Sequence, residues 1–483
     1  MSAAQVAEPE VETPDPQRWR ALAVALTAAF MTLLDVTIVN VALPSIRDGL
    51  HATDRELQWI LAGYSLMFGL VLVPAGRLGD ARGRRRMFIT GIAAFTLSSA
   101  AAGTATSGTF LLVARLVQGA AGGLLTPQVS GLIQQLFRGP ERGRAFGFLG
   151  AVVSLSTAVG PLVGGVLIAV FGATEGWRWI FYVNLPIGAT AIALSFRTIP
   201  GTLGKHARES LDPIGVVLLG GGVALVLLPL IENAHWWLCA VAVAVFAAFV
   251  SWERWYGRRR TPLVALELFR STPYTVGVLV ALLYFSAFTP LFFLFALYLQ
   301  TGLHDDPLQT GLGVVPFALG SAASAVIGGR LVARFGRLIV VAGLTTVLVG
   351  LGLSMLAVTE FPAGAAHWAT IGPWFLAGIG SGFVVAPNQT LTLSDVPVNR
   401  AGSAGGVVQT AQRVGAAFGL AVITAAFFGH DSGRSTSSAY DHAAAFCMLF
   451  VLIALTVAVT DVLAHRRVPA TGAPPIILEP PLP

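Results

Sequence analysis

Long apolar runs are the dominant feature of this chain, and they leave few choices of fold. We identify fourteen runs, each about 17–25 residues long, which is the length that a helix needs to cross the hydrocarbon core of a bilayer. Their centres lie near residues 32, 66, 97, 122, 157, 189, 222, 244, 287, 320, 347, 378, 415 and 452. The sequence therefore predicts an all-α polytopic membrane protein of the cell membrane.

The composition excludes several other classes of protein. Hydrophobic residues make up 55% of the 483 residues and charged residues only 11%, whereas a soluble chain carries charges at about a quarter of its positions. Every connecting segment is short, so neither a nucleic-acid-binding module nor an extracellular enzyme has room. Cys239 and Cys447 are too few for a disulfide framework, and the histidines lack metal-ligand spacing. We expect no catalytic residue, no metal and no cofactor.

The basic residues alternate between connecting segments, and this alternation predicts the topology. Lys and Arg collect in the cytoplasmic loops of membrane proteins. Arg115 and Arg413 lie inside predicted helices, and the expected outer segments hold only Arg47, Arg55, Arg178 and Arg434. All other basic residues fall in the alternate, inner segments, at 18–20, 77–86, 138–144, 197–208, 254–270, 330–337, 400 and 466–467. Both termini are therefore expected in the cytoplasm.

A motif recurs in two of the inner segments. Residues 76–84 read GRLGDARGR and residues 329–337 read GRLVARFGR, with Ala333 in the place of Asp80. Equivalent loops eight helices apart indicate two six-helix bundles with two extra helices between them, at about 213–250. Duplicated halves of this kind are typical of transporters that bind substrate between the halves near the bilayer midplane.

The repeat also sets the expected domain boundaries. Residues 18–200 form the N-terminal bundle, 201–262 the extra helices with their flanking loops, and 263–467 the C-terminal bundle. Residues 1–17 lack the basic start of a signal peptide and are expected to be a disordered cytoplasmic tail. Residues 468–483 form a proline-rich cytoplasmic tail.

One acidic residue stands alone in the first apolar run. Asp35 lies between Leu34 and Val36, and a charge at the centre of a membrane helix costs about 2.5–3.5 kcal/mol, so it persists there with a partner or a function. A carboxylate that exchanges a proton with either side of the membrane could couple transport to a proton gradient.

Several separated motifs resemble the major facilitator superfamily, specifically its fourteen-helix drug:proton antiporters of the EmrB/QacA type. The likeness covers nearly the whole chain. The segments that carry it are Leu34–Pro44, the loop Gly76–Arg84, Arg115 with Gln118, Gly119 and Gly122, the run Gly160–Gly165 (GPLVGG), and Trp177–Phe181 followed by Asn184–Gly188. The resemblance implies a major facilitator fold and proton-driven export of hydrophobic or amphipathic small molecules by alternating access.

The resemblance assigns proton coupling to Asp35 and Arg115. If the first helix ended near Pro44, Asp35 would lie roughly 13 Å from its outer end, and Arg115 roughly 10 Å from the outer end of its own helix, at 1.5 Å per residue. The two residues would then lie at similar depth, and the resemblance implies a fold that brings their helices to the same cavity. The alternative is that Arg115 only satisfies backbone carbonyls and that Asp35 only bonds Thr37 or a neighbouring helix.

Two further motifs have an implied role and a plainer alternative. Gly160, Pro161, Gly164 and Gly165 belong to the antiporter motif, which could form a tightly packed, pliable seam against proton leak or show ordinary small-residue packing. The inner loop contributes a predicted gate through Gly76, Asp80, Gly83 and Arg84. Asp80 could lock that gate through a charge pair or a helix N-terminus, although the arginines also fix topology.

The substrate cavity is predicted in less detail. Aromatic residues Tyr284, Phe288, Phe292 and Phe295 could form an apolar wall or could be packing residues. Arg413 could contact an anionic or phenolic group of the substrate or brace the C-terminal bundle, and we favour bracing. The polar candidates are Asn40, Gln118, Asn388, Gln389, Gln409 and Gln412.

The scarcity of buried acids limits the expected substrates. Asp35 is the one acid clearly placed at mid-membrane, so we expect neutral, monocationic or weakly acidic amphipaths to be better substrates than dications. The partners are then the substrate, protons and the lipid bilayer, with no nucleic acid, and we expect the chain to work as a monomer. Two alternatives stay open: export of a self-made metabolite, lipid or siderophore, and proton-driven uptake, which the Gly160–Gly165 motif disfavours.

Overall fold

The computed structural model describes residues 16–172, 174–201, 212–232, 235–305, 307–428 and 436–467. Within these ranges every regular element is helical. Thirteen spans are long and apolar enough to cross a membrane. The fourteenth predicted segment is the helix Arg84–Gly103, which begins with three arginines that lower its hydropathy. The predicted all-α polytopic class is confirmed, whereas the two predicted tails lie outside the described residues except for Pro16 and Gln17.

The N-terminal half consists of six spans, the last of which is broken into two helices. Its elements are α1 (Arg18–Leu50), α2 (Asp54–Arg82), α3 (Arg84–Gly103), α4 (Gly108–Leu136), α5 (Gly139–Phe171), α6 (Gly176–Tyr182) and α7 (Asn184–Thr198). Its core has two hydrophobic clusters, centred on buried residues such as Phe88, Phe95 and Phe146 at one end and Trp177 at the other.

The two extra helices and the C-terminal half follow. The extra helices are α8 (Pro213–Glu232) and α9 (Trp237–Tyr256). The C-terminal half contains η1 (Leu266–Arg270), α10 (Thr272–Leu297), the π-helical turn η2 (Tyr298–Gly302), α11 (Pro307–Phe335), α12 (Arg337–Glu360), α13 (Ala363–Thr392), η3 (Val398–Arg400), α14 (Ala401–Phe428) and α15 (Thr436–Arg467). One large hydrophobic cluster fills this half.

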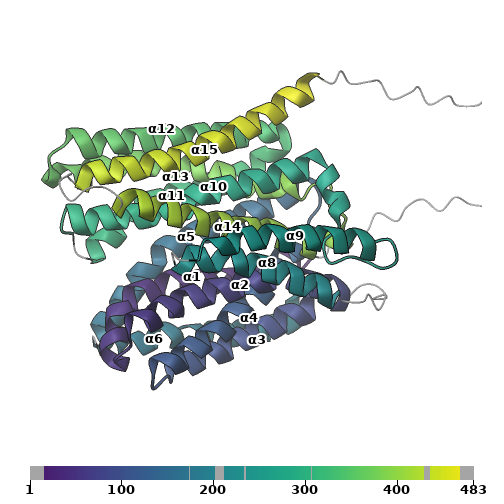
Figure 1. The fold of residues 1–483 in the computed structure, drawn as a ribbon, viewed down its shortest axis with the longest axis horizontal. Helices are drawn as coiled ribbons and strands as arrows, with labels where there is room; N and C mark the ends of the chain where they lie inside the picture. Colours follow the sequence, from purple (N-terminus) through teal and green to yellow (C-terminus); the bar gives the residue numbers. More distant parts are fainter. Residues whose placement is uncertain are drawn as a thin grey trace, which may run out of the picture.

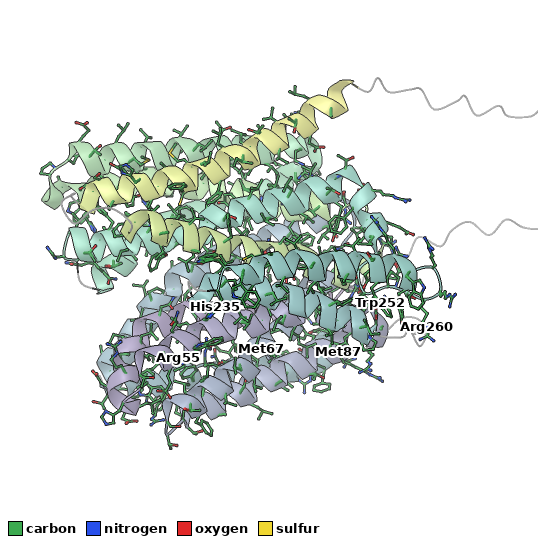
Figure 2. The ribbon with its side chains drawn as sticks, in the orientation of Figure 1. Arg55, Met67, Met87, His235, Trp252 and Arg260 are labelled. Atoms are coloured by element: carbon green, nitrogen blue, oxygen red, sulfur yellow. The ribbon has the colours of Figure 1, made fainter. Side chains whose placement is uncertain are left out.

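The two halves lie side by side as two layers of roughly parallel helices (Figure 1). Helices α8 and α9 pack on each other and lie against α2 and α14, which belong to different halves. At one end of the bundle lie the start of α3 at Met87, Trp252 of α9 and Arg260, whereas Arg55 lies toward the opposite end (Figure 2). We call the first of these the arginine-rich end.

Two helices differ from the sequence prediction. Helix α1 does not end near Pro44 but continues to Leu50, with Pro44 inside it. The sixth span is interrupted at Val183, between α6 and α7. Pro186 explains this break, because it has no N–H to donate to the carbonyl of Tyr182 and its ring crowds that carbonyl.

The halves are joined from the arginine-rich end to about mid-depth. Helices α5 and α11 run along each other through small residues: a methyl group added at Gly147 would lie 2.8 Å from the carbonyl oxygen of Ala325. Farther along, the hydroxyls of Ser154 and Ser321 are 2.7 Å apart. Close packing of α5 on α11 through small residues therefore joins the two halves.

Candidate functional site

The carboxylate of Asp35 is fully buried and is held by three side chains from other helices. Arg115 on α4 donates from Nη1 to Oδ2. Gln118, one turn farther along α4, donates to Oδ1 at 2.9 Å, and Asn184 at the start of α7 donates to the same oxygen at 3.1 Å. Residues three apart share one helix face, so α4 presents both of its donors to α1.

Arg115 is itself almost completely enclosed, at 1% exposure. Its guanidinium also donates to Oε1 of Gln118 at 2.8 Å and lies 4.2 Å from the ring centre of Tyr64. Charge-assisted hydrogen bonds of this kind are about twice as strong as neutral ones. The site is therefore a compensated ion pair in its present arrangement, and the alternative in which Arg115 serves backbone carbonyls accounts for only one bond, to Ile60 at 3.4 Å.

Two of the hydrogen-bond donors to Asp35 were not predicted from the sequence in that role. Gln118 was assigned to the substrate cavity, yet its amide bonds Asp35 and Arg115. Asn184 was noted only as part of a family motif, and the signal that could have found it is Pro186, which breaks the sixth span beside it. Ser99 supports Asn184, since the Asn184 amide donates to the Ser99 hydroxyl at 3.0 Å.

The antiporter-motif glycines of α5 bring that helix against the part of α1 that follows Asp35. A methyl group at Gly160 would overlap the Thr37 side chain, and one at Gly164 would lie 3.0 Å from the Ile38 side chain. Thr37 also donates to the carbonyl of Ser156 at 3.1 Å. Gly165 faces open space, so the motif glycines are not equivalent.

Asp80 lies at the arginine-rich end and reaches from α2 across to the other half. Its two carboxylate oxygens accept the backbone N–H groups of Gly402 at 3.0 Å and Ser403 at 2.9 Å, which begin α14. Asp80 also pairs with Arg84 at 2.9 Å, and Arg84 donates to the carbonyl of Val398. Both mechanisms expected for Asp80, a charge pair and a helix N-terminus, are present together.

Two glycines of the loop 76–84 are required for different structural reasons. Gly83 has φ +97°, a conformation that side chains disfavour. Gly76 packs so closely on α14 that an added methyl group would lie 2.9 Å from the N atom of Ser403.

The predicted cavity residues of the C-terminal half lie mainly in packed positions. Tyr284 and Phe288 are buried in the hydrophobic cluster of that half, where Phe288 contacts Phe292 and Phe317. Asn388 accepts a bond from Arg337 at 2.7 Å and donates to the carbonyl of Gly277 at 2.9 Å, so it braces α12 and α10 and does not line a cavity.

Polar residues nearer the contact between the halves behave differently. Gln409 and Gln389 each donate to the hydroxyl of Ser130 on α4 at 3.1 Å, which links the halves. Asn40, more than one turn after Asp35, is exposed. Among the described residues, no group of three or more His, Cys, Asp or Glu could hold a metal ion.

The prediction that Arg413 braces the C-terminal bundle is wrong. Its guanidinium lies 4.3 Å from the ring centre of Phe68, which belongs to α2 of the N-terminal half. The reason is geometric: on α14, one face carries Gly415 and Gly419, which pack closely on α10, while Gly402 and Gly406 pack on α2. Arg413 continues the second face.

Comparisons with known proteins agree with this architecture. The model of the Major Facilitator Superfamily matches residues 25–420. The probable actinorhodin transporter of Streptomyces coelicolor is 35% identical over 440 residues, covering 89% of this chain and 76% of that protein. The puromycin resistance protein of Streptomyces alboniger is 34% identical, covering 91% and 89%. A multidrug resistance protein of Mycobacterium tuberculosis is 33% identical, covering 82% and 73%.

Solved structures show the same fold at low identity. The human organic anion transporter MFSD10 superposes with a TM-score of 0.65 at 17% identity, covering 92% of this chain and 99% of that one. The proton:xylose symporter XylE superposes with a TM-score of 0.63 at 14% identity, covering 91% and 96%.

Proposed function

Because this chain belongs to the major facilitator superfamily and is a multi-pass membrane transporter, we propose that it exports amphipathic small molecules, such as antibiotics, in exchange for protons. Its relatives include proteins named for the export of, or resistance to, actinorhodin, puromycin and several drugs. In this proposal it is one of the fourteen-helix drug:proton antiporters, and it works as a monomer by alternating access.

The observation that carries the proton coupling is the buried Asp35–Arg115 pair. Removing one member of a buried ion pair costs about 3–5 kcal/mol because the other charge is left uncompensated. A proton on Asp35 likewise leaves the charge of Arg115 uncompensated. It also turns the carboxylate, which accepts three hydrogen bonds, into a group that can donate one. Protonation therefore changes the packing of α1, α4 and α7 together.

The antiporter motif connects this change to the contact between the halves. Helix α5 meets α1 next to Asp35 through Gly160, and it meets α11 of the other half through Gly147 and Ser154. A shift of α1 is therefore transmitted through α5, a single packed helix, to its contact with α11 of the other half. Asp80 holds the arginine-rich side closed through the start of α14, and opening to the cytoplasm requires that this contact be broken.

The energy available from one proton is sufficient for resistance. Exchange of a neutral substrate for one proton moves one charge, which supplies about 2.3 kcal/mol per 100 mV, or roughly a 50-fold gradient, before any pH difference.

Export of a compound that the cell makes itself is a second candidate. Two relatives that are named for the transport or export of one compound favour it, the probable actinorhodin transporter and the cephamycin export protein of Amycolatopsis lactamdurans. A deletion strain separates the candidates: it accumulates a native product if the cargo is self-made, and it becomes drug-sensitive without such accumulation if the cargo is foreign.

Reconstitution tests the mechanism. Vesicles containing the full chain are given an imposed pH gradient and a panel of labelled puromycin, tetracenomycin C and ethidium. We expect gradient-driven movement of at least one compound, abolished by a protonophore. Movement that is equally fast with the gradient collapsed would contradict proton coupling.

A further inference from the structure

Two arginines lie in the middle of the transmembrane region, and their electrostatic situations are opposite. Arg115 is neutralised by Asp35. Arg413 lies near the middle of α14 (Ala401–Phe428), and among the described residues its contact is the face of the Phe68 ring at 4.3 Å, with no acidic side chain paired to it. An aromatic face attracts a cation, but it carries no net charge.

Asp35 cannot serve as the counter-ion of Arg413 in this arrangement. Its Oδ2 is engaged by Arg115, and its Oδ1 accepts bonds from Gln118 at 2.9 Å and Asn184 at 3.1 Å. Tyr64 lies between the two arginines, with its ring centre 4.2 Å from the Arg115 guanidinium and 6.0 Å from the ring centre of Phe68. The centre of the protein therefore carries an uncompensated positive charge when Asp35 is ionised.

The Arg413 side chain is not sealed in the core. It is half-buried, as are its neighbours Ala411, Gln412 and Val414, although they lie halfway along a membrane helix. Toward the end opposite the arginine-rich end, Leu420 is 38% exposed. Leu420 lies seven residues after Arg413, on the same face of α14, so this face is partly open from Arg413 toward that end.

We propose that Arg413 recognises the acidic group of an aromatic substrate, a carboxylate or an ionised phenol. Guanidinium binds oxyanions through paired N–H donors in a planar fork and also stacks on aromatic rings. A planar aromatic acid satisfies both properties, because its oxyanion compensates the charge while its ring lies beside Tyr64 and Phe68. The inference rests on the proposed export function and narrows its substrate class.

A purely structural role for Arg413 makes a different prediction. If the residue only held α14 against α2, replacing it would weaken the binding of charged and neutral substrates alike. The two roles therefore separate on a pair of probes that differ in charge but not in shape.

The experiment uses 2-naphthoic acid and 2-naphthamide as matched probes with the purified full-length protein at neutral pH. We expect the wild type to bind the acid at least about tenfold more tightly than the amide, which corresponds to one charge-assisted contact. Arg413→Gln should lose that preference while amide binding changes less than about twofold, and Arg413→Lys should keep part of it. Arg400→Gln removes a half-buried charge that is paired with Glu267 at 3.4 Å, next to the start of α14, and serves as the control with an unchanged preference.

Two results would overturn the proposal: no preference for the acid in the wild type, or an undiminished preference in Arg413→Gln. If Arg413→Gln does not fold, Arg413→Lys decides, since an unchanged preference there would exclude recognition by the guanidinium fork. Gradient-driven efflux of the labelled panel of puromycin, tetracenomycin C and ethidium is measured in parallel. Its absence would count against the proton-driven export itself and would leave the comparison of acid and amide binding intact.

Discussion

The two copies of the repeated motif, residues 76–84 and 329–337, lie at the same end of the molecule but form different contacts. In the N-terminal copy, Asp80 leaves its own half and accepts two backbone N–H groups at the start of α14. In the C-terminal copy, Ala333 stands in that place and is exposed. Arg337, the counterpart of Arg84, stays within its own half, where it pairs with Asp461 at 3.2 Å.

The two copies of the motif therefore indicate that the duplicated halves have different roles. The N-terminal half supplies the buried Asp35–Arg115 pair and the contact that holds the other half. In the C-terminal half, Arg337 instead braces three helices of its own half. The centre of this half is filled by aromatic packing around Phe295 and Trp374, whose rings stack at 3.8 Å.

The largest expected effect distinguishes two of the buried acids, Asp35 and Asp461. Asp35→Asn should reduce gradient-driven export to the level of empty vesicles, because an amide cannot take up and release a proton. Asp461→Asn also removes one partner of a buried pair, at a cost in stability of about 3–5 kcal/mol, but coupling should persist in the protein that folds. Export per folded molecule and thermal stability are measured for both. If Asp461→Asn uncoupled transport as fully as Asp35→Asn, the assignment of different roles to the two halves would be wrong.

The next effect concerns the contact between α5 and α1. Gly160→Ala places a methyl group against Thr37 and Ile38, and overpacking of this kind costs about 1–3 kcal/mol. We expect slower export and a raised passive proton leak, recorded with a pH-sensitive dye in vesicles. Gly165→Ala is the matched control, because its methyl group meets open space. Equal leak in both variants would remove the proposed role of the α1 contact.

A smaller effect is expected at the arginine-rich end. Asp80→Asn keeps a side chain that can accept a hydrogen bond but loses the charge beside Arg84 and the helix start. Loss of a negative charge at a helix N-terminus costs about 0.3–2 kcal/mol, so the equilibrium constant for closure on this side should fall roughly 2–30-fold. Labelling of a cysteine introduced at Ser394 reports the opening, and insertion and orientation should be unchanged. Unaltered labelling together with normal export would exclude a gating role.

The smallest effect is expected from restoring the missing acid. Ala333→Asp recreates the motif of the first copy, but the side chain at this position is exposed, so stability should change by no more than about 0.5 kcal/mol. Export rates within twofold of the wild type are expected in vesicles. A strong slowing would mean that this position reaches the start of α5 during the cycle and that the two copies are more alike than their contacts indicate.

Sequence patterns were sufficient for features that depend on hydropathy and charge. The fourteen apolar runs and the internal repeat follow from residue types and spacing, whereas the pairing of Asp35 with Arg115 also required the resemblance to the family. The depth argument assumed that α1 ends near Pro44, but α1 continues to Leu50, because a proline within a membrane helix can be accommodated by its neighbours.

Side-chain partners between helices were harder to predict. Asn388 and Gln118 are polar residues at helical positions, and nothing in a single sequence separates an amide that lines a cavity from one that bonds a buried charge. The aromatic residues of α10 share this ambiguity, since their spacing is the same for a cavity wall and for a packed core. The ligand Asn184 required knowledge of the bend that Pro186 introduces.

The central claim is that a proton on Asp35 is exchanged for substrate. The most direct test loads vesicles with a pH-sensitive dye, imposes a gradient of a compound that the wild type exports, and applies no initial pH difference. The wild type should move protons against the substrate flux, and Asp35→Asn should move none while still binding the compound. Substrate flux in the wild type without any proton movement, or the same proton movement in Asp35→Asn, would contradict the mechanism.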